Sequence, residues 1–223
     1  ACRKLAPNLK KLSGERVYSE LLKLLACRHP LPSLTQCRDC KVIEHLFGSA
    51  PSDARLEALK NLIAYEDECG NHDPIRRLFI FSQENTDLPK FARRLKLSKT
   101  IETRLKRINT TPNLFSTTLK EPDVYKILYK NGKQLFVDNL LTTSANFPER
   151  RPSNWISLVQ MAYTWVPPRC PISGADVLAL GIPEGPLVGQ MVIEAETWWV
   201  DSDFKASRQE TLDHLMTLSK QWK

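Results

Sequence analysis

The segment best suited to chemistry is the cationic run KFARRLKLSKTIETRLKR at residues 90–107. It carries eight Lys and Arg residues against one acid, Glu102, so its net charge is 8 − 1 = +7. Positive charge that is not balanced locally repels itself unless an anionic partner is present. The phosphates of a nucleic acid supply such a partner without base-specific contacts. The run therefore predicts a nucleic-acid surface, the alternative being an ordinary solvated helix face. The predicted contacts are Lys90, Arg93, Arg94, Lys96, Lys99, Arg104, Lys106 and Arg107.

Cysteine and histidine residues form a second, zinc-like pattern. Cys37 and Cys40 make a C-x-x-C pair, and Cys69 and His72 make a C-x-x-H pair further along the chain. Zinc pairs usually lie on turns, whereas Cys37 and Cys40 fall in a helical pattern, where cysteine acts as a small apolar residue. His72 and Asp73 also spell the HD dipeptide of metal phosphohydrolases, but Asp73 is explained as a helix cap before a proline. A zinc or HD-type hydrolase is thus a third interpretation, and we predict no metal site.

The other polar clusters do not predict a catalytic centre. Residues 66–68 (EDE) and 201–203 (DSD) could pair carboxylates on magnesium, but both sequences are typical of polar turns beside helix ends. No Ser-His-Asp constellation, P-loop lysine or dinucleotide fingerprint is evident. We therefore predict no catalytic residue in this chain.

The stretch GIPEGPLVG at residues 181–189 has the glycines of a phosphate loop but lacks its Lys-Ser/Thr ending. We expect it to join two helices. In this interpretation Gly181 ends the first helix, Gly185 caps the next, Pro186 begins it, and Gly189 allows close approach of a neighbouring backbone.

Helical spacing of apolar residues runs along the chain, and the alternation typical of strands is almost absent. In residues 13–26, Ser13 is the expected N-cap of a helix with an apolar stripe through Val17, Leu21 and Leu25. Further helices are predicted over 34–47, 53–68, 73–82, 88–97, 98–108, 121–145, 154–166, 175–181, 190–200 and 208–222. The pattern predicts an all-α fold, with a multi-helix elongated body and a small helical C-terminal tail.

Composition narrows the class of protein further. No apolar run approaches the ~20 residues needed to span a bilayer, so we expect no membrane association. The first residues lack the apolar stretch of a signal peptide, and six cysteines then favour a reducing cytoplasm. The chain begins without methionine, and we expect it to be a piece of a longer protein. The net charge is 11 − 6 = +5 over 1–65, 10 − 7 = +3 over 66–108, 6 − 4 = +2 over 109–151 and 5 − 8 = −3 over 152–223.

Several stretches occur in a recognisable order. They are LKKLSGERVYSELLKLL, DPIRRL, RRLKLSKTIETRL and PISGADVLALGIPEGPLVGQMVIEAETWWVDSDFKASRQETLDHL. Together they resemble the bacterial tRNA nucleotidyltransferase (CCA-adding enzyme) and poly(A) polymerase family, over nearly the whole chain. The resemblance implies neck helices over 1–65, a helical body over 66–165 and a helical tail over 166–223.

The resemblance also implies where catalysis resides. Ser13, Gly14, Glu15 and Arg16 correspond to the SxER stretch, which braces the nucleotide-selecting part of the neck. The family's head carries a Gly-Ser loop and paired magnesium-binding aspartates, and a Glu-Asp-x-x-Arg motif that selects CTP and ATP comes just before the SxER stretch. None of these precedes residue 1, so the chain is expected to be inactive alone, with magnesium, CTP and ATP belonging to a missing head.

In such a protein the body and tail form an arm that binds tRNA, and double-stranded RNA is recognised largely by shape, phosphates and 2′-hydroxyls. Arg76 and Arg77 are secondary candidates for these contacts. The helix start at Gly185 and Pro186, with Gly189 beside it, presents free amides to a phosphate. A stand-alone RNA-binding protein is the alternative. Oligomeric state and the choice between CCA and A addition stay open.

Overall fold

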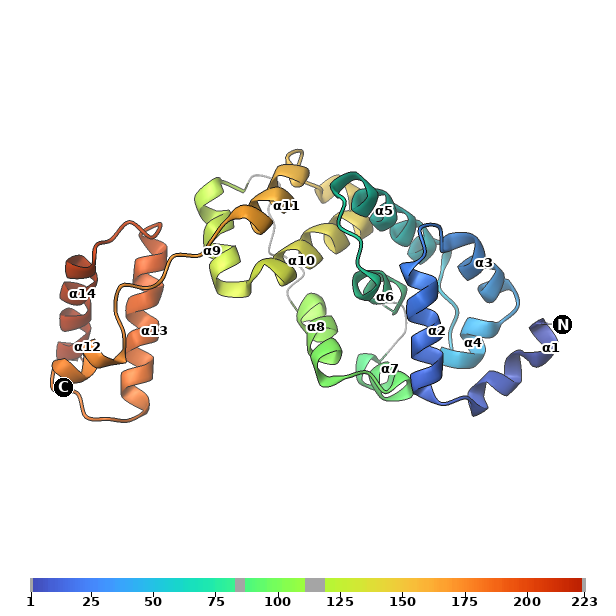
Figure 1. Ribbon diagram of the computed structural model, residues 1–223, viewed down its shortest axis with the longest axis horizontal. Helices are drawn as coiled ribbons and strands as arrows, with labels where there is room; N and C mark the ends of the chain where they lie inside the picture. The colour runs from blue at the N-terminus through green and yellow to red at the C-terminus, as the bar shows by residue number, and fades with distance from the viewer. Residues whose placement is uncertain (1, 83–86, 111–118, 222–223) are drawn as a thin grey trace. The chain divides into compact units, whose positions relative to one another are not determined.

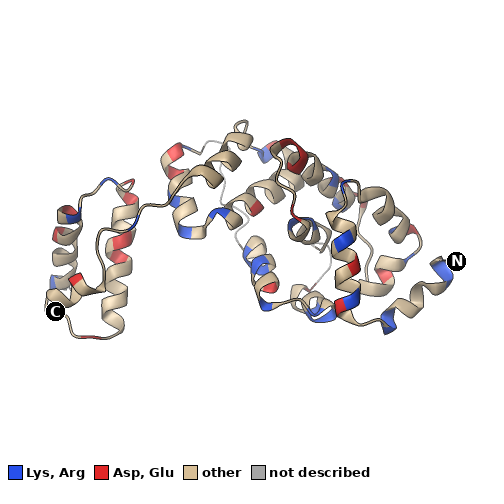
Figure 2. Cartoon of the chain, viewed as in Figure 1, with Lys and Arg blue, Asp and Glu red and all other residues tan. Residues whose placement is uncertain are grey.

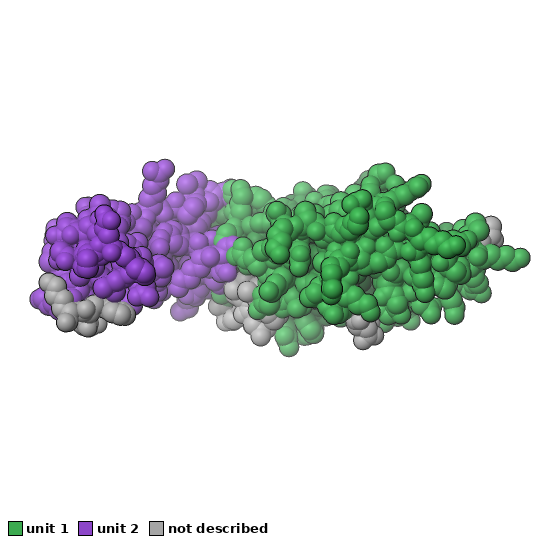
Figure 3. All heavy atoms as spheres, turned by 90° about the horizontal axis from the view of Figure 1, so that it is seen from below, with its two compact units in different colours: residues 1–119, 132–163 green, residues 120–131, 164–223 purple. Residues whose placement is uncertain are grey.

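The computed structural model describes residues 2–82, 87–110 and 119–221 of the chain. Over these residues the secondary structure consists of helices, with no strand (Figure 1), which confirms the predicted all-α fold. By packing, the chain divides into two compact units, residues 1–119 with 132–163 and residues 120–131 with 164–223 (Figure 3). The division into neck, body and tail that the resemblance implies stays a prediction, because it names regions of the related proteins and not units that pack together.

The first unit is built from short and medium helices, with α5 packed against α10. α5 contacts α10 and α6, α2 contacts α6 and α7, and α8 contacts α6 and α10 (Figure 1). Its helices are α1 (Cys2–Leu5), the 3-10 helix η1 (Ala6–Lys11), α2 (Gly14–Ala26), α3 (Leu31–Asp39), α4 (Val42–Phe47), α5 (Asp53–Cys69), α6 (Pro74–Ser82), α7 (Leu88–Leu95), α8 (Lys99–Thr110), α10 (Lys133–Asn146), η2 (Pro148–Arg150) and α11 (Trp155–Thr164). Within the described ranges, none of the helices is long and apolar enough to cross a membrane.

Two helix starts follow the predicted capping chemistry. The Ser13 hydroxyl accepts a hydrogen bond from the backbone N–H of Arg16 at the start of α2. The Asp73 carboxylate accepts hydrogen bonds from the N–H groups of Ile75 (2.8 Å) and Arg76 (3.3 Å) at the start of α6. Both caps satisfy amides that have no partner inside the helix. These two predictions are confirmed.

Two predicted helices are each broken in the middle. The segment 34–47 is divided between α3 and α4 because Lys41 has a φ of 60°. The segment 121–145 is divided between α9 and α10 at Gly132, which has a φ of 79°. A left-handed residue interrupts the helical hydrogen-bond ladder, and glycine adopts that conformation at little steric cost. The predictions of single helices here are wrong, because apolar spacing continues across a tight turn.

The second unit contains α9 (Glu121–Asn131), α12 (Gly174–Ala179), α13 (Pro186–Asp201) and α14 (Arg208–Gln221). A capping box starts α12, with the Ser173 backbone N–H donating to Asp176 at 2.8 Å. On the α9 side, the Tyr129 hydroxyl donates to the Glu196 carboxylate at 2.5 Å. Buried apolar residues hold the unit together: Ile172, Val177, Ile182, Met191, Ala195 and Leu215.

The glycine-rich stretch joins α12 to α13 largely as predicted. Gly181 follows the end of α12 with a φ of 80°, Gly185 is the N-cap of α13, and Pro186 is its first residue. Gly189 does not lie against a neighbouring backbone, because a Cβ built there would meet no atom within 4 Å. That part of the prediction is wrong.

Candidate nucleic-acid interface

The cationic run folds into two helices, and the first is α7. The Asp87 carboxylate caps it by accepting a hydrogen bond from the Lys90 backbone N–H at 3.2 Å. Phe91 and Leu95 are buried on one face of α7, while Lys90 and Arg93 are exposed on the other. The apolar face anchors the helix, and the cations stay in solvent.

A tight turn then separates α7 from α8. Lys96 adopts a left-handed conformation with a φ of 52°, and the Ser98 hydroxyl accepts a hydrogen bond from the N–H of Ile101. The predicted break near Ser98 is thereby confirmed. Leu105 and Ile108 are buried on α8. The cations Lys99, Lys106 and Arg107 are exposed, and Figure 2 shows basic residues along both helices.

Arg104 differs from its basic neighbours because two carboxylates bind it. Its guanidinium donates to Asp138 at 2.8 Å from Nε and to Asp73 at 2.5 Å from Nη2. Burial alone would lower the pKa of Arg104, but the hydrogen bonds and charges of these carboxylates outweigh it and raise that pKa. Its side chain is 23% exposed, so Arg104 connects α8 to the core and offers little surface to a phosphate.

Arg76 and Arg77 are buried, with exposed fractions of 0% and 1%. The guanidinium of Arg76 binds Glu66 at 2.8 Å and Asp138 at 3.2 Å. That of Arg77 binds Glu66 at 2.6 Å and the backbone carbonyl of Leu25 at 2.7 Å. This burial contradicts the prediction that Arg76 and Arg77 contact RNA, since an RNA phosphate cannot reach a side chain enclosed by the fold.

These ion pairs form one buried network, which the sequence analysis did not identify. Three arginines meet three carboxylates, so their formal charges cancel. The network joins α5, α6, α8 and α10 and fixes α8 against the core.

Burial opposes ionisation of Asp73, but hydrogen bonding and charge from Arg104 lower its pKa. One feature of the sequence could have indicated this network, namely the carboxylate of Asp138 inside the apolar run LFVDNLL. A charge buried by such a run requires a partner of opposite charge. The members are Glu66, Asp73, Arg76, Arg77, Arg104 and Asp138.

The SxER stretch lies against the end of α7. A Cβ at Gly14 would collide with the backbone carbonyl oxygen of Arg94, so only glycine permits this approach. Glu15 pairs with Lys96 at 3.2 Å, and both side chains are largely exposed. The Arg94 guanidinium reaches the carbonyls of Leu9 and Leu12 at 3.4 and 3.5 Å, which are long hydrogen bonds. The stretch thus joins α2 to the cationic helix.

His72 and Asp73 of the zinc and HD patterns have other partners. His72 Nε2 lies 2.6 Å from Asp67 Oδ1, and Asp73 binds Arg104 and caps α6. Where a carboxylate of residues 66–68 or 201–203 forms an ion pair, its partner is an Arg, Lys or His side chain. In the part of the chain that the structure describes, no three His, Cys, Asp or Glu residues are grouped so that they could hold a metal ion.

The fold and surface define an all-α module with a cationic face. Residues 1–52 match a family model described as "Probable RNA and SrmB- binding site of polymerase A". The mitochondrial CCA tRNA nucleotidyltransferases 1 of Mus musculus and Danio rerio are each 24% identical, over 94% and 96% of this chain. These alignments cover 47% and 49% of the two proteins, so the chain spans about half the length of the curated relatives it matches.

Solved structures of CCA-adding enzymes share the fold. An apo form matches with a TM-score of 0.61 and 18% identity, over 96% of this chain and 52% of that chain. The Thermotoga maritima CCA-adding enzyme complexed with tRNA matches with a TM-score of 0.56 and 17% identity, over 95% and 53%. The chain is thus similar to tRNA nucleotidyltransferases (CCA-adding enzymes), in agreement with the resemblance seen in the sequence.

Proposed function

We propose that this chain is a tRNA-binding region of a tRNA nucleotidyltransferase, and that the exposed cations of α7 and α8 contact the phosphate backbone of the RNA. One observation carries the proposal. Lys90, Arg93, Lys99 and Lys106 are exposed, and their side chains form no ion pair with another described residue. The fold thus balances its buried arginines and leaves these surface cations unbalanced, which favours an anionic partner.

The proposed contacts suit a ligand recognised without regard to base sequence. A-form RNA presents phosphates and 2′-hydroxyls on its surface, and proteins recognise it largely by shape. The cations follow two consecutive helices, so they offer a series of phosphate contacts. The Thermotoga maritima enzyme solved with tRNA supports tRNA as the RNA in question.

The test is a charge reversal confined to exposed positions. The triple variant Arg93→Glu, Lys99→Glu, Lys106→Glu should bind tRNA more weakly. The slope of the logarithm of the association constant against the logarithm of the salt concentration should become shallower by about two to three, because each cation accounts for about one phosphate contact. The matched control is Lys23→Glu with Lys60→Glu, since these lysines are exposed on α2 and α5 and pair within their own helices. Unchanged affinity of the triple variant at low salt would show that the run is a solvated face.

We further propose that the parent protein adds CCA to tRNA 3′ ends, and that its catalytic head, with magnesium and a CTP or ATP site, lies in the portion of the family's length that this chain does not span. The names of the curated relatives support CCA addition over A addition alone. On this proposal the chain alone incorporates no nucleotide into tRNA. Coding sequence upstream of Ala1 should encode a Gly-Ser loop followed by paired aspartates, whereas a start codon directly upstream would make the chain a stand-alone RNA-binding protein.

The start of α13 is a secondary proposed contact. Pro186 is exposed at its first turn, where the helix dipole favours an anion, although the Val188 N–H already donates to the Gly185 carbonyl and the nearby exposed Glu184 disfavours an anion. Pro186→Glu should weaken tRNA binding if a phosphate sits there, and an unchanged affinity would remove this contact. We also propose a reducing compartment such as the cytoplasm, because all six cysteines are free thiols.

A further inference from the structure

A hollow of about 440 Å³ lies between η1, α4 and α7 in the first unit. Its volume falls within the range of sites that bind small molecules, about 300–1,000 Å³. Lys10 contributes from η1, His45 and Phe47 from α4, and Lys90 and Arg94 from α7. The hollow shares Lys90 and Arg94 with the cationic run, but it is concave and partly apolar.

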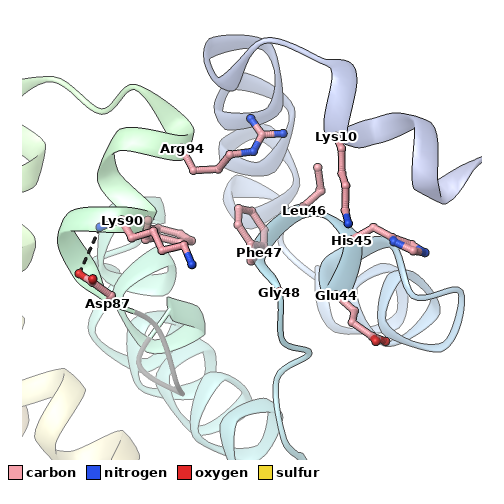
Figure 4. Close-up of a pocket in the computed structure, with 10 residues that line it drawn as sticks. Lys10, Glu44, His45, Leu46, Phe47, Gly48, Asp87, Lys90 and Arg94 are labelled. Carbon is pink, nitrogen blue, oxygen red and sulfur yellow. Dashed lines mark hydrogen bonds between the residues drawn. The ribbon is translucent and has the colours of Figure 1, made fainter.

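The charges around the hollow favour an anion. Lys90 reaches from α7 toward Phe47, and Lys10 reaches from η1 toward His45 (Figure 4). Two carboxylates also line the rim. The Asp87 carboxylate caps α7, and that of Glu44 points away from the cations (Figure 4). Two lysines and one arginine therefore surround a space into which neither carboxylate points.

An aromatic ring forms one wall of the hollow. Phe47 is half-buried and packs on Phe91, with ring centroids 5.1 Å apart, and forms a T-shaped pair with Phe81 at 6.5 Å. These contacts fix the ring and leave part of it facing the hollow. An aromatic surface next to cations is the combination that binds a base together with its phosphate.

We propose that this hollow binds one unpaired nucleotide of the RNA, with its phosphate held by Lys10 and Lys90 and its base against Phe47. The inference rests on the proposed function, since it assigns a subsite for single-stranded RNA next to the phosphate-binding helices. A duplex keeps its bases stacked inside and offers only backbone to a protein surface. An unpaired nucleotide can enter a concave site with both its base and its phosphate.

The experiment compares two labelled probes, a single-stranded RNA hexamer and a blunt 12-base-pair RNA duplex, by fluorescence anisotropy with the full chain. Lys10→Glu should weaken hexamer binding about tenfold, and Phe47→Leu should weaken it at least about fivefold, the lower end of base stacking on an aromatic ring. Both variants should leave duplex binding within about threefold, because neither side chain lies on α7 or α8. Phe47→Tyr keeps the ring and should retain hexamer binding.

The matched control is Lys99→Glu, which lies on the cationic run outside the hollow and should weaken duplex binding more than hexamer binding. A hexamer affinity that is unchanged in both Lys10→Glu and Phe47→Leu, with duplex binding intact, overturns the nucleotide site and leaves the proposed function standing. An effect of Lys10→Glu without one of Phe47→Leu overturns the base contact and hence the proposal. If the unaltered chain binds neither probe nor tRNA, the proposed function fails as well.

Discussion

The buried ion network makes Asp138 a residue on which much of the stability of the first unit depends. Its carboxylate accepts hydrogen bonds from Arg104 Nε and Nη2, both at 2.8 Å, from Arg76 Nε at 3.2 Å and from Gln134 at 3.0 Å. Asp138→Asn keeps the shape of the side chain but replaces one acceptor oxygen by a donor. The change also leaves three buried or half-buried arginines with two carboxylates.

The expected cost follows from that imbalance. Removing one partner of a buried ion pair costs about 3–5 kcal/mol, because the remaining charge has no counterpart and little water. The whole free energy of unfolding of a domain is about 5–15 kcal/mol. Since the amide oxygen of asparagine retains some of the hydrogen bonds, we expect a loss of about 3 kcal/mol, within the lower part of the range for a broken buried pair.

Urea unfolding followed by circular dichroism measures this loss. With a slope of about 2 kcal/mol/M, the midpoint of the first unit should fall by about 1.5 M. Glu20→Gln is the matched control, because Glu20 pairs with Lys23 on an exposed helix face and its loss should cost less than about 0.5 kcal/mol. An Asp138→Asn midpoint equal to that of the control would refute the view that the network stabilises the unit.

Two further predictions follow from the backbone and from the titration of Asp73. Gly14→Ala should destabilise the chain by about 1–3 kcal/mol, because the added methyl group collides with the Arg94 carbonyl. Gly189→Ala should stabilise it by about 0.5–1 kcal/mol, because the site is open and helical. Thermal unfolding of both variants checks the pair, and equal shifts would contradict it. The folded-state pKa of Asp73 lies below the unfolded value of about 3.9, so its carboxylate stabilises the fold above about pH 4, and this stabilisation is lost as pH falls through the folded value. Asp73→Asn keeps a capping side chain and should reduce the loss of unfolding free energy as the pH falls below about 4. An unchanged pH dependence would show that the ion pair of Asp73 with Arg104 does not contribute.

Local chemistry in the sequence was sufficient for much of the fold. Ser13 and Asp73 have side chains that cap helices, and Pro186 cannot continue a preceding helix, so each fixes a boundary within a few residues of itself. The alternation of cations and apolar residues in 90–107 likewise determined which face of α7 and α8 is exposed. The ordered motifs also indicated the family to which the chain is similar.

Burial and partnership depend on residues distant in the chain, and only the tertiary structure decided them. Arg76 and Arg93 have the same side chain, but Arg76 meets Asp138 from 62 residues away and is enclosed, whereas Arg93 is exposed. Gly14 and Gly189 both lie within helices, but only at Gly14 does another backbone occupy the space of a Cβ. The sequence determined what each segment can form, while the packing of helices determined which charges are neutralised and which remain exposed to solvent. This division has a physical cause: capping and periodicity act over one or two turns, whereas ion pairing acts between whichever side chains the fold brings within a few ångströms.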